Sequence, residues 1–240
     1  MKYFVILVLL LVSYKETKIK GPVLQLPGLL LCSFIPILLD KHVEMTMLTE
    51  DQGRTLIHLA RQTIEEYLGI APASPVSPKE LDDPALHEQL AVFVTLNKRG
   101  QLRGCIGTLV GMESIVDGVR RHAVNAAFND HRFSPVKAEE VAELEIDISV
   151  LTEPGCLEYV DADDLLGKLR PKVDGVILKH PSGAGATFLP QVWEQLPSTP
   201  LFLGHLCRKA GLTEDEWRTG KLEIQTYQVQ YFKESGSRPA

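Results

Sequence analysis

The sequence predicts an α+β fold in which hairpins of strands alternate with helices. Two runs of strand-like composition flank a turn that ends at Gly100, and two more flank a glycine-rich turn around Gly183. Segments whose apolar residues recur at helical spacing separate these hairpins. Regular strand–helix–strand repetition is lacking, which favours α+β over a doubly wound parallel sheet.

The first elements follow from capping and periodicity. Thr49 to Gln52 form a capping box, and apolar residues then recur at helical spacing until Gly69, which predicts an opening helix. The next twenty residues contain four prolines among small residues and predict a surface loop. Residues 91–96 and 101–108 then predict the two strands of a hairpin.

The second half of the chain alternates in the same way. Residues 113–128 carry an apolar stripe typical of a helix, and a polar loop follows at 129–135. Strict alternation at 144–151 predicts a half-buried strand, and the second hairpin pairs 174–179 with 186–190. We expect a helix over 201–210, a second capping box from Thr213 to Glu216, and one closing strand over 222–232.

Composition limits the classes of function. The chain has 240 residues, enough for one large domain or two small ones, and 45% of them are hydrophobic. Its net charge of −6, without a long run of either sign, gives no electrostatic footprint for nucleic acid. The four cysteines lie far apart and form no zinc-type pair, so we expect neither a disulfide framework nor a bound metal or cofactor. A reduced, cytoplasmic setting fits best.

The N-terminal segment, residues 1–44, is expected to lie outside the folded domain. Its apolar run at 3–12 has the length of a signal-peptide core but lacks a cleavage site, and its second run at 22–39 contains three prolines. Translation starting at Met45 or Met47 would explain the segment. The alternative is a membrane anchor, and only then would the protein contact a membrane. Residues 235–240 are expected to form a flexible tail.

The stretch from Leu102 to Leu109, LRGCIGTL, is the most informative motif. In an extended strand, Leu102, Gly104 and Ile106 would point one way, and Arg103 and Cys105 the other. A guanidinium beside a thiol would favour the thiolate, and glycines would let a ligand or another backbone approach. The alternative is a packed, inert thiol, with the glycines serving close packing.

Five landmarks in a fixed order are similar to those of the AMMECR domain family. They are the motif at 102–109, the loop Asp130-x-Arg132-Phe133-x-Pro135, the strand ending at Thr152, the hairpin beginning Asp174-Gly175-Val176, and Leu189-Pro190-Gln191-Val192-Trp193. The ordered set is specific where a single piece would be weak. The chain resembles the microbial form, AmmeMemoRadiSam system protein A, over residues 47–234.

The resemblance implies a larger, mostly antiparallel sheet flanked by helices, with a smaller hairpin-containing lobe. It also implies two partners, a Memo-like protein and a radical SAM protein, in a modification pathway. Cofactor chemistry would belong to the partner, because this chain lacks the clustered cysteines of an iron–sulfur site. The family's proposed functional surface maps onto Arg103, Gly104, Cys105, Gly107, Asp130 and Arg132. The family often has proline where this chain has His131, so an essential base at His131 is not expected.

Two functions remain open from the sequence. Cys105 could be a nucleophile, with Arg103 or Arg132 holding an anionic substrate. Such a thiol usually needs a base, for which the candidates are His122, His131, His180 and His205. The alternative, which we favour, is an accessory binding component that takes a small molecule, peptide or protein partner, because no base or metal ligand accompanies the cysteine in sequence.

Simpler structural roles are expected for other residues. Asp130 and Arg132 would form an ion pair or cap a loop. His205 and Cys207 lie two apart on a predicted helix and do not face one another, so we expect both to pack.

Overall fold

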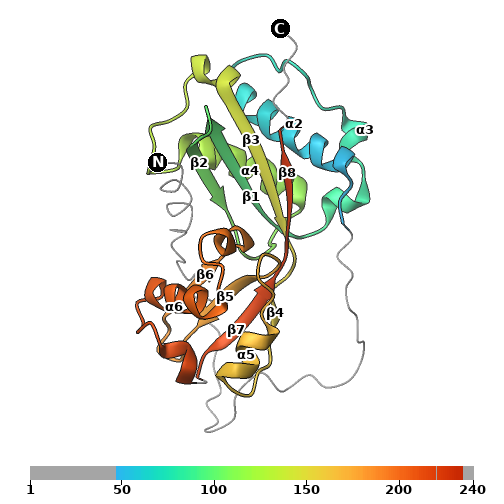
Figure 1. Ribbon diagram of the computed structural model, residues 1–240. Coiled ribbons are helices and arrows are strands. Elements are labelled where there is room, and N and C mark those ends of the chain that lie inside the picture. Colours follow the sequence, from blue (N-terminus) through green and yellow to red (C-terminus); the bar gives the residue numbers. More distant parts are fainter. Residues whose placement is uncertain (1–46, 220, 235–240) are drawn as a thin grey trace, which may run out of the picture.

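The computed structural model describes residues 47–219 and 221–234, which form two lobes (Figure 1). The large lobe comprises residues 47–151 and 229–234, and the small lobe is the insertion 152–228 between them. Each lobe contains a four-stranded antiparallel sheet, which confirms the α+β class. The expectations for residues 1–44 and 235–240 fall outside the described residues.

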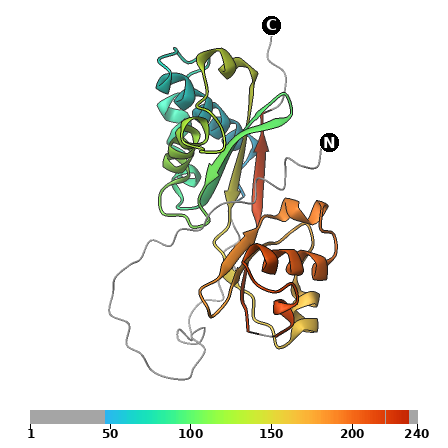
Figure 2. The ribbon, with the colours of Figure 1, turned by 90° about the vertical axis from the view of Figure 1, so that its left-hand side faces the viewer.

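The sheet of the large lobe has the strand order β2-β1-β3-β8 and is covered by helices on one face. Its elements are α2 (Glu50–Tyr67), β1 (Ala91–Lys98), β2 (Gln101–Gly107), α4 (Ile115–Phe128), η2 (Ala138–Glu143), β3 (Leu144–Leu151) and β8 (Val229–Lys233). Figure 2 shows α2 and α4 on the same side of the strands. Their apolar stripes, which include Leu56 and Val119, bury the sheet residues Val94 and Ile148 completely.

Side-chain caps determine where these helices begin. Thr49 accepts a hydrogen bond from the Gln52 N–H, and the Gln52 side chain accepts one from the Thr49 N–H at 2.7 Å, which confirms the capping box. Ser114 caps α4 by accepting from the Asp117 N–H at 3.1 Å. The proline-rich segment is not entirely a loop, because it contains two short helical turns, α3 (Pro78–Leu81) and η1 (Pro84–His87).

The small lobe packs two helices against its sheet, whose strand order is β4-β7-β5-β6. Its elements are β4 (Gly155–Cys156), α5 (Ala162–Lys168), β5 (Gly175–Lys179), β6 (Gly185–Phe188), η3 (Pro190–Glu194), α6 (Thr199–Lys209), η4 (Glu216–Thr219) and β7 (Glu223–Tyr227). Trp193 is fully buried in the core of the small lobe and stacks on Phe202, with ring centroids 3.7 Å apart. Its indole N–H donates a hydrogen bond to the Asp174 carbonyl at 2.7 Å.

Two expectations about the C-terminal third were wrong. The closing strand is two strands, because the chain leaves one sheet and enters the other at Gln228, whose carbonyl accepts from the Thr152 N–H at 3.0 Å. The capping box expected at Thr213 does not begin an α-helix. The Thr213 hydroxyl donates to the Glu216 carboxylate, and the short 3₁₀ turn η4 follows. In the described part of the chain, no helix has both the length and the apolar character to span a bilayer.

Candidate functional site

Cys105 lies on β2, the edge strand of the large-lobe sheet, where the two lobes meet. It belongs to a buried apolar cluster with Ala91, Phe93 and Leu151 of the large lobe and Tyr227 of the small lobe. The sequence-predicted motif therefore lies at the junction of the lobes.

A β-bulge changes the directions expected for the motif. Leu96 pairs with Gly104, but Asn97 pairs with Leu102, so Arg103 is the extra residue. Leu102 consequently joins the apolar cluster around Cys105, and Arg103 turns away from it toward η2. The expectation that Arg103 and Cys105 lie side by side was wrong.

The Cys105 thiol is buried, and its pKa is raised. The residue is 7% exposed, and its Sγ accepts a hydrogen bond from the Thr95 hydroxyl at 3.2 Å. Burial raises the pKa of the Cys105 thiol to about 11, and the opposing effects of Thr95 and of the Arg132 charge do not overcome it. The expected thiolate is therefore disfavoured. Burial destabilises the charged form of Cys105 more than the nearby Arg132 charge stabilises it.

The two glycines of the motif allow close packing inside the protein. A Cβ on Gly104 would lie closer than 3.0 Å to the Ala126 carbonyl oxygen of α4. A Cβ on Gly107 would come equally close to the Phe93 ring. Both positions serve contact between elements of the fold, where the sequence had also suggested room for a ligand.

Arg103 forms an ion-pair network near the turn of the β1–β2 hairpin. Its Nη2 donates to Glu140 at 3.0 Å, and Lys98 donates to the same carboxylate at 2.9 Å. The hydrogen bond from Arg103 is the main reason that the pKa of Glu140 falls to about 2. Arg103 thus ties β2 to η2.

Asp130 and Arg132 together bind the open edge of β2 at Cys105. Asp130, which is 4% exposed, accepts from the Cys105 N–H at 2.9 Å, and Arg132 donates to the Cys105 carbonyl at 3.0 Å. The two side chains also form a bidentate pair, with distances of 2.8 and 2.6 Å. Burial by itself would raise the pKa of Asp130. The hydrogen bonds from Arg132 and from the Cys105 N–H together have the larger effect, so the pKa of Asp130 is lowered. The pair satisfies backbone groups that a neighbouring strand would otherwise satisfy.

The histidines considered as bases either contact other residues or are exposed to solvent. His122 on α4 is 1% exposed, and its Nε2 lies 3.2 Å from Arg121. Burial lowers the pKa of His122 to about 4. His131 is exposed in its loop, and His205 contacts Arg208 on α6 at 2.7 Å. In the part of the chain that the structure describes, no histidine hydrogen-bonds to the Cys105 thiol.

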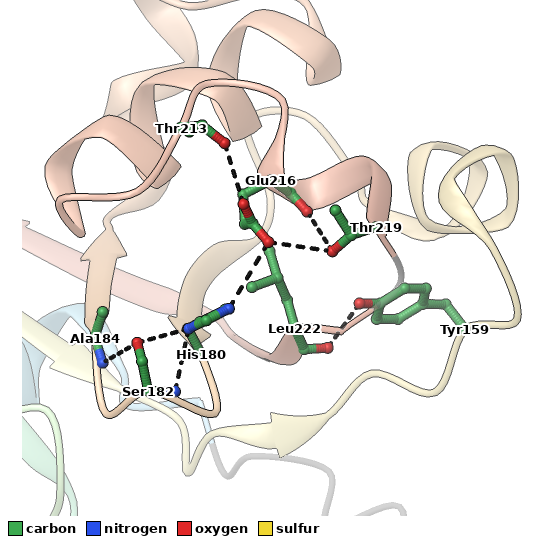
Figure 3. Close-up of polar contacts among 8 residues, drawn as sticks. All are labelled: Tyr159, His180, Ser182, Ala184, Thr213, Glu216, Thr219 and Leu222. Atoms are coloured by element: carbon green, nitrogen blue, oxygen red, sulfur yellow. Dashed lines mark hydrogen bonds and ion pairs between the residues drawn. The ribbon is translucent and has the colours of Figure 1, made fainter.

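His180 lies in the small lobe and links two of its turns (Figure 3). Its Nδ1 accepts from the Ser182 N–H at 3.1 Å and lies 2.6 Å from the Ser182 hydroxyl. Its Nε2 faces Glu216 at 3.7 Å, and the Thr213 hydroxyl holds that carboxylate from the other side at 3.1 Å. The cluster joins the β5–β6 turn to η4.

A row of polar residues crosses the sheet on the face opposite α2 and α4, which we call the open face. Strand register places Lys233, Asp147, Thr95 and Cys105 next to one another on four neighbouring strands. Burial raises the pKa of Asp147 despite the nearby Lys233 charge. Sequence alternation had marked the second face of β3 as available, but it could not identify the residues opposite Asp147.

Tyr231 lies on the open face two residues from Lys233 along β8, opposite Ser149. Burial raises its pKa above the usual range. Within residues 47–219 and 221–234, His, Cys, Asp and Glu side chains form no group of three that could hold a metal ion. The accessible part of the open face therefore consists of exposed Lys233 beside half-buried Asp147, Thr95 and Tyr231.

Comparison with known proteins gives consistent similarities over most of the chain. A family model described as AMMECR1 matches residues 57–232. A protein of Methanothermobacter thermautotrophicus is 37% identical over 194 residues, which cover 79% of this chain and 97% of that protein. Protein Mbar_A1807 of Methanosarcina barkeri is 36% identical, covering 78% and 93% of the two chains. The crystal structure of the uncharacterized protein PH0010 from Pyrococcus horikoshii is similar at a TM-score of 0.67 and 32% identity, covering 78% and 94%.

Proposed function

The chain belongs to the AMMECR1 family, and from this premise we propose that it is an accessory binding component that engages a partner protein through its open face. The observation that carries the proposal is the unequal cover of the two faces of the large-lobe sheet. Helices bury one face, whereas the small lobe covers the other around Cys105 and leaves Lys233 exposed and Asp147 and Thr95 half-buried. Protein interfaces combine an apolar core with a polar, solvent-accessible rim.

The state of the thiol supports binding over nucleophilic catalysis. A nucleophilic cysteine needs an accessible thiolate and a base within hydrogen-bond reach. Cys105 has a pKa of about 11 and a threonine as its hydrogen-bond donor. At neutral pH its thiol stays protonated, so its packing in the junction of the lobes is the better supported role.

The proposed partners are a Memo-like protein and a radical SAM protein, acting with this chain in a modification pathway. The basis is the family resemblance, and the partner would supply the cofactor chemistry. Asp147 and Lys233 offer both signs of charge, so the complementary surface is expected to pair opposite charges there.

A binding experiment with the full chain tests this proposal. Purified Memo-like and radical SAM proteins are titrated separately against the wild type, Asp147→Ala and Tyr231→Ala. We expect each substitution to weaken one of the two complexes at least tenfold. Arg54→Ala, an exposed position on α2, is the matched control and should bind as the wild type does. Absence of both complexes, or equal affinity for all variants, would refute the open face as the binding surface.

The role of the thiol is tested with Cys105→Ser. Retained binding and retained function in cells would agree with a packing role. Retained binding with complete loss of function would instead support the nucleophile.

A further inference from the structure

Lys209 occupies an unusual position in the small lobe. It lies in the last turn of α6, where the helix dipole favours a cation, but its side chain reaches across to β6. Its Nζ donates to the Thr187 carbonyl at 3.0 Å and lies 5.2 Å from the centre of the Phe188 ring. Figure 1 shows α6 beside this strand.

The register of the hairpin shows that Thr187 turns its backbone polar groups outward. The His180 N–H donates to the Ala184 carbonyl at 2.8 Å, which makes 180 and 184 a hydrogen-bonded pair. Such pairs alternate along an antiparallel ladder, so the Thr187 position is a non-hydrogen-bonded one. Because β6 is an edge strand, the N–H and carbonyl of Thr187 both face away from the sheet.

The Thr187 N–H and the Lys209 ammonium are therefore neighbouring donors. Lys209 already binds the Thr187 carbonyl, and an ammonium has three N–H groups, so two remain. Thr187 is 9% exposed, and no described residue accepts a hydrogen bond from its N–H. A buried backbone donor without an acceptor is costly and uncommon in folded proteins.

No carboxylate compensates the charge of Lys209 within the described residues. Burial alone lowers the pKa of Lys209 to about 8, because its half-buried ammonium has lost part of its hydration without gaining an anion among the described residues. Lys179, on the neighbouring strand, provides a contrast, since it pairs with Glu223 at 3.3 Å. A cation that has lost much of its hydration is normally paired with an anion.

We infer that Lys209 Nζ and the Thr187 N–H form a binding site for the oxyanion group, carboxylate or phosphate, of a small-molecule ligand. Two adjacent donors, one of them charged, match two oxygens of one such group. The anion would supply both the missing acceptor for the Thr187 N–H and the missing counter-ion for Lys209. This site lies on the small lobe and does not depend on the partner binding proposed for the open face.

Amide NMR spectroscopy of the full chain tests the inference. Inorganic phosphate and acetate are titrated separately, with sodium chloride at matched ionic strength as the reference. We expect the Thr187 amide resonance to shift and saturate with at least one of the two anions, and not with chloride. A stronger response to phosphate identifies a phosphate site, and a stronger response to acetate a carboxylate site.

Variants separate the specific site from general salt effects. Lys209→Met keeps the length of the side chain but removes its charge, and it should abolish the saturable shift, whereas Lys179→Met should leave it unchanged. Thermal unfolding of both variants establishes that they are folded. A shift that persists in Lys209→Met, or the absence of a saturable shift in the wild type with either anion, would overturn the inference.

The backbone donor is tested by a pair of substitutions. Thr187→Val removes the hydroxyl and keeps the N–H, and Lys209 should then still report anion binding through the shift of its own Nζ resonance. Thr187→Pro removes the N–H at an edge position, where proline is tolerated, and should weaken binding at least tenfold. Equal affinity of these two variants would exclude the Thr187 N–H from the site.

Discussion

Replacing Gly104 by alanine tests whether the motif glycine serves packing inside the fold. The new Cβ would lie closer than 3.0 Å to the Ala126 carbonyl oxygen and 3.1 Å from its carbon, where ordinary contact begins at 3.4 Å. Because the obstacle is helix backbone, α4 would have to move away from β2 by about 1 Å. Overpacking of this kind costs about 3 kcal/mol, and the reduced entropy of the unfolded chain offsets at most about 1 kcal/mol.

The expected net loss is therefore about 2 kcal/mol, or a lowering of Tm by about 4–8 °C for a chain of this size. Urea unfolding and calorimetry measure both quantities. Gly155→Ala is the matched control, because its Cβ would meet nothing within 4 Å, and it should change stability by less than about 0.5 kcal/mol. If Gly104→Ala were as stable as this control but bound its partner weakly, the packing explanation would be refuted and ligand approach supported.

Three further predictions concern charge and the thiol. Folded His122 has a pKa of about 4 against 6.5 for the free side chain, so as pH falls the unfolded state binds the proton first. About 3 kcal/mol of stability, fully present above pH 6.5, should be lost between pH 6.5 and 4, and urea titrations of His122→Leu should lack this loss. Asp130→Ala removes a buried carboxylate that pairs with half-buried Arg132 and accepts from the Cys105 N–H, and it should cost about 3 kcal/mol in urea unfolding. In native protein, iodoacetamide should modify exposed Cys156 well before Cys105, and denaturant should remove the difference, as mass spectrometry can measure.

Each of these predictions has an outcome that contradicts it. Equal pH dependence in the wild type and His122→Leu would mean that His122 is not buried as a neutral group. A fully stable Asp130→Ala variant would show that the hydrogen bonds of the Asp130–Arg132 pair to the edge of β2 add nothing to folding stability. Modification of native Cys105 as fast as that of Cys156 would restore the nucleophile as the stronger hypothesis.

Local signals in the sequence were sufficient for most elements. The capping box at Thr49 fixed the start of α2, and the alternation at 144–151 gave β3 with the bounds observed. These signals succeed because hydrogen bonds within a helix turn and the side-chain period of a strand depend on near neighbours in the chain. The division of the closing strand at Gln228 lacked such a signal, since it depends on pairing with Thr152, far away in sequence.

The motif around Cys105 could be found but not oriented from the sequence. Arg99 and Gly100 both adopt positive φ, 52° and 73°, which sets the hairpin turn. The bulge after that turn then puts Arg103 on the opposite side from the one that simple alternation predicts. A one-residue change in register reverses the face of a side chain, so composition alone cannot assign it.

The sequence by itself determined the α+β class, most of the longer helices and strands, and the location of the most informative motif. Only the tertiary structure decided the chemistry there, because Thr95, Asp130 and Arg132 reach Cys105 through strand register and a loop that closes on an edge strand. The same holds for Lys209, whose meeting with Thr187 depends on how α6 packs against β6. Burial and pKa arise from such distant contacts, and they are physical properties of the packed chain that no local pattern of residues encodes.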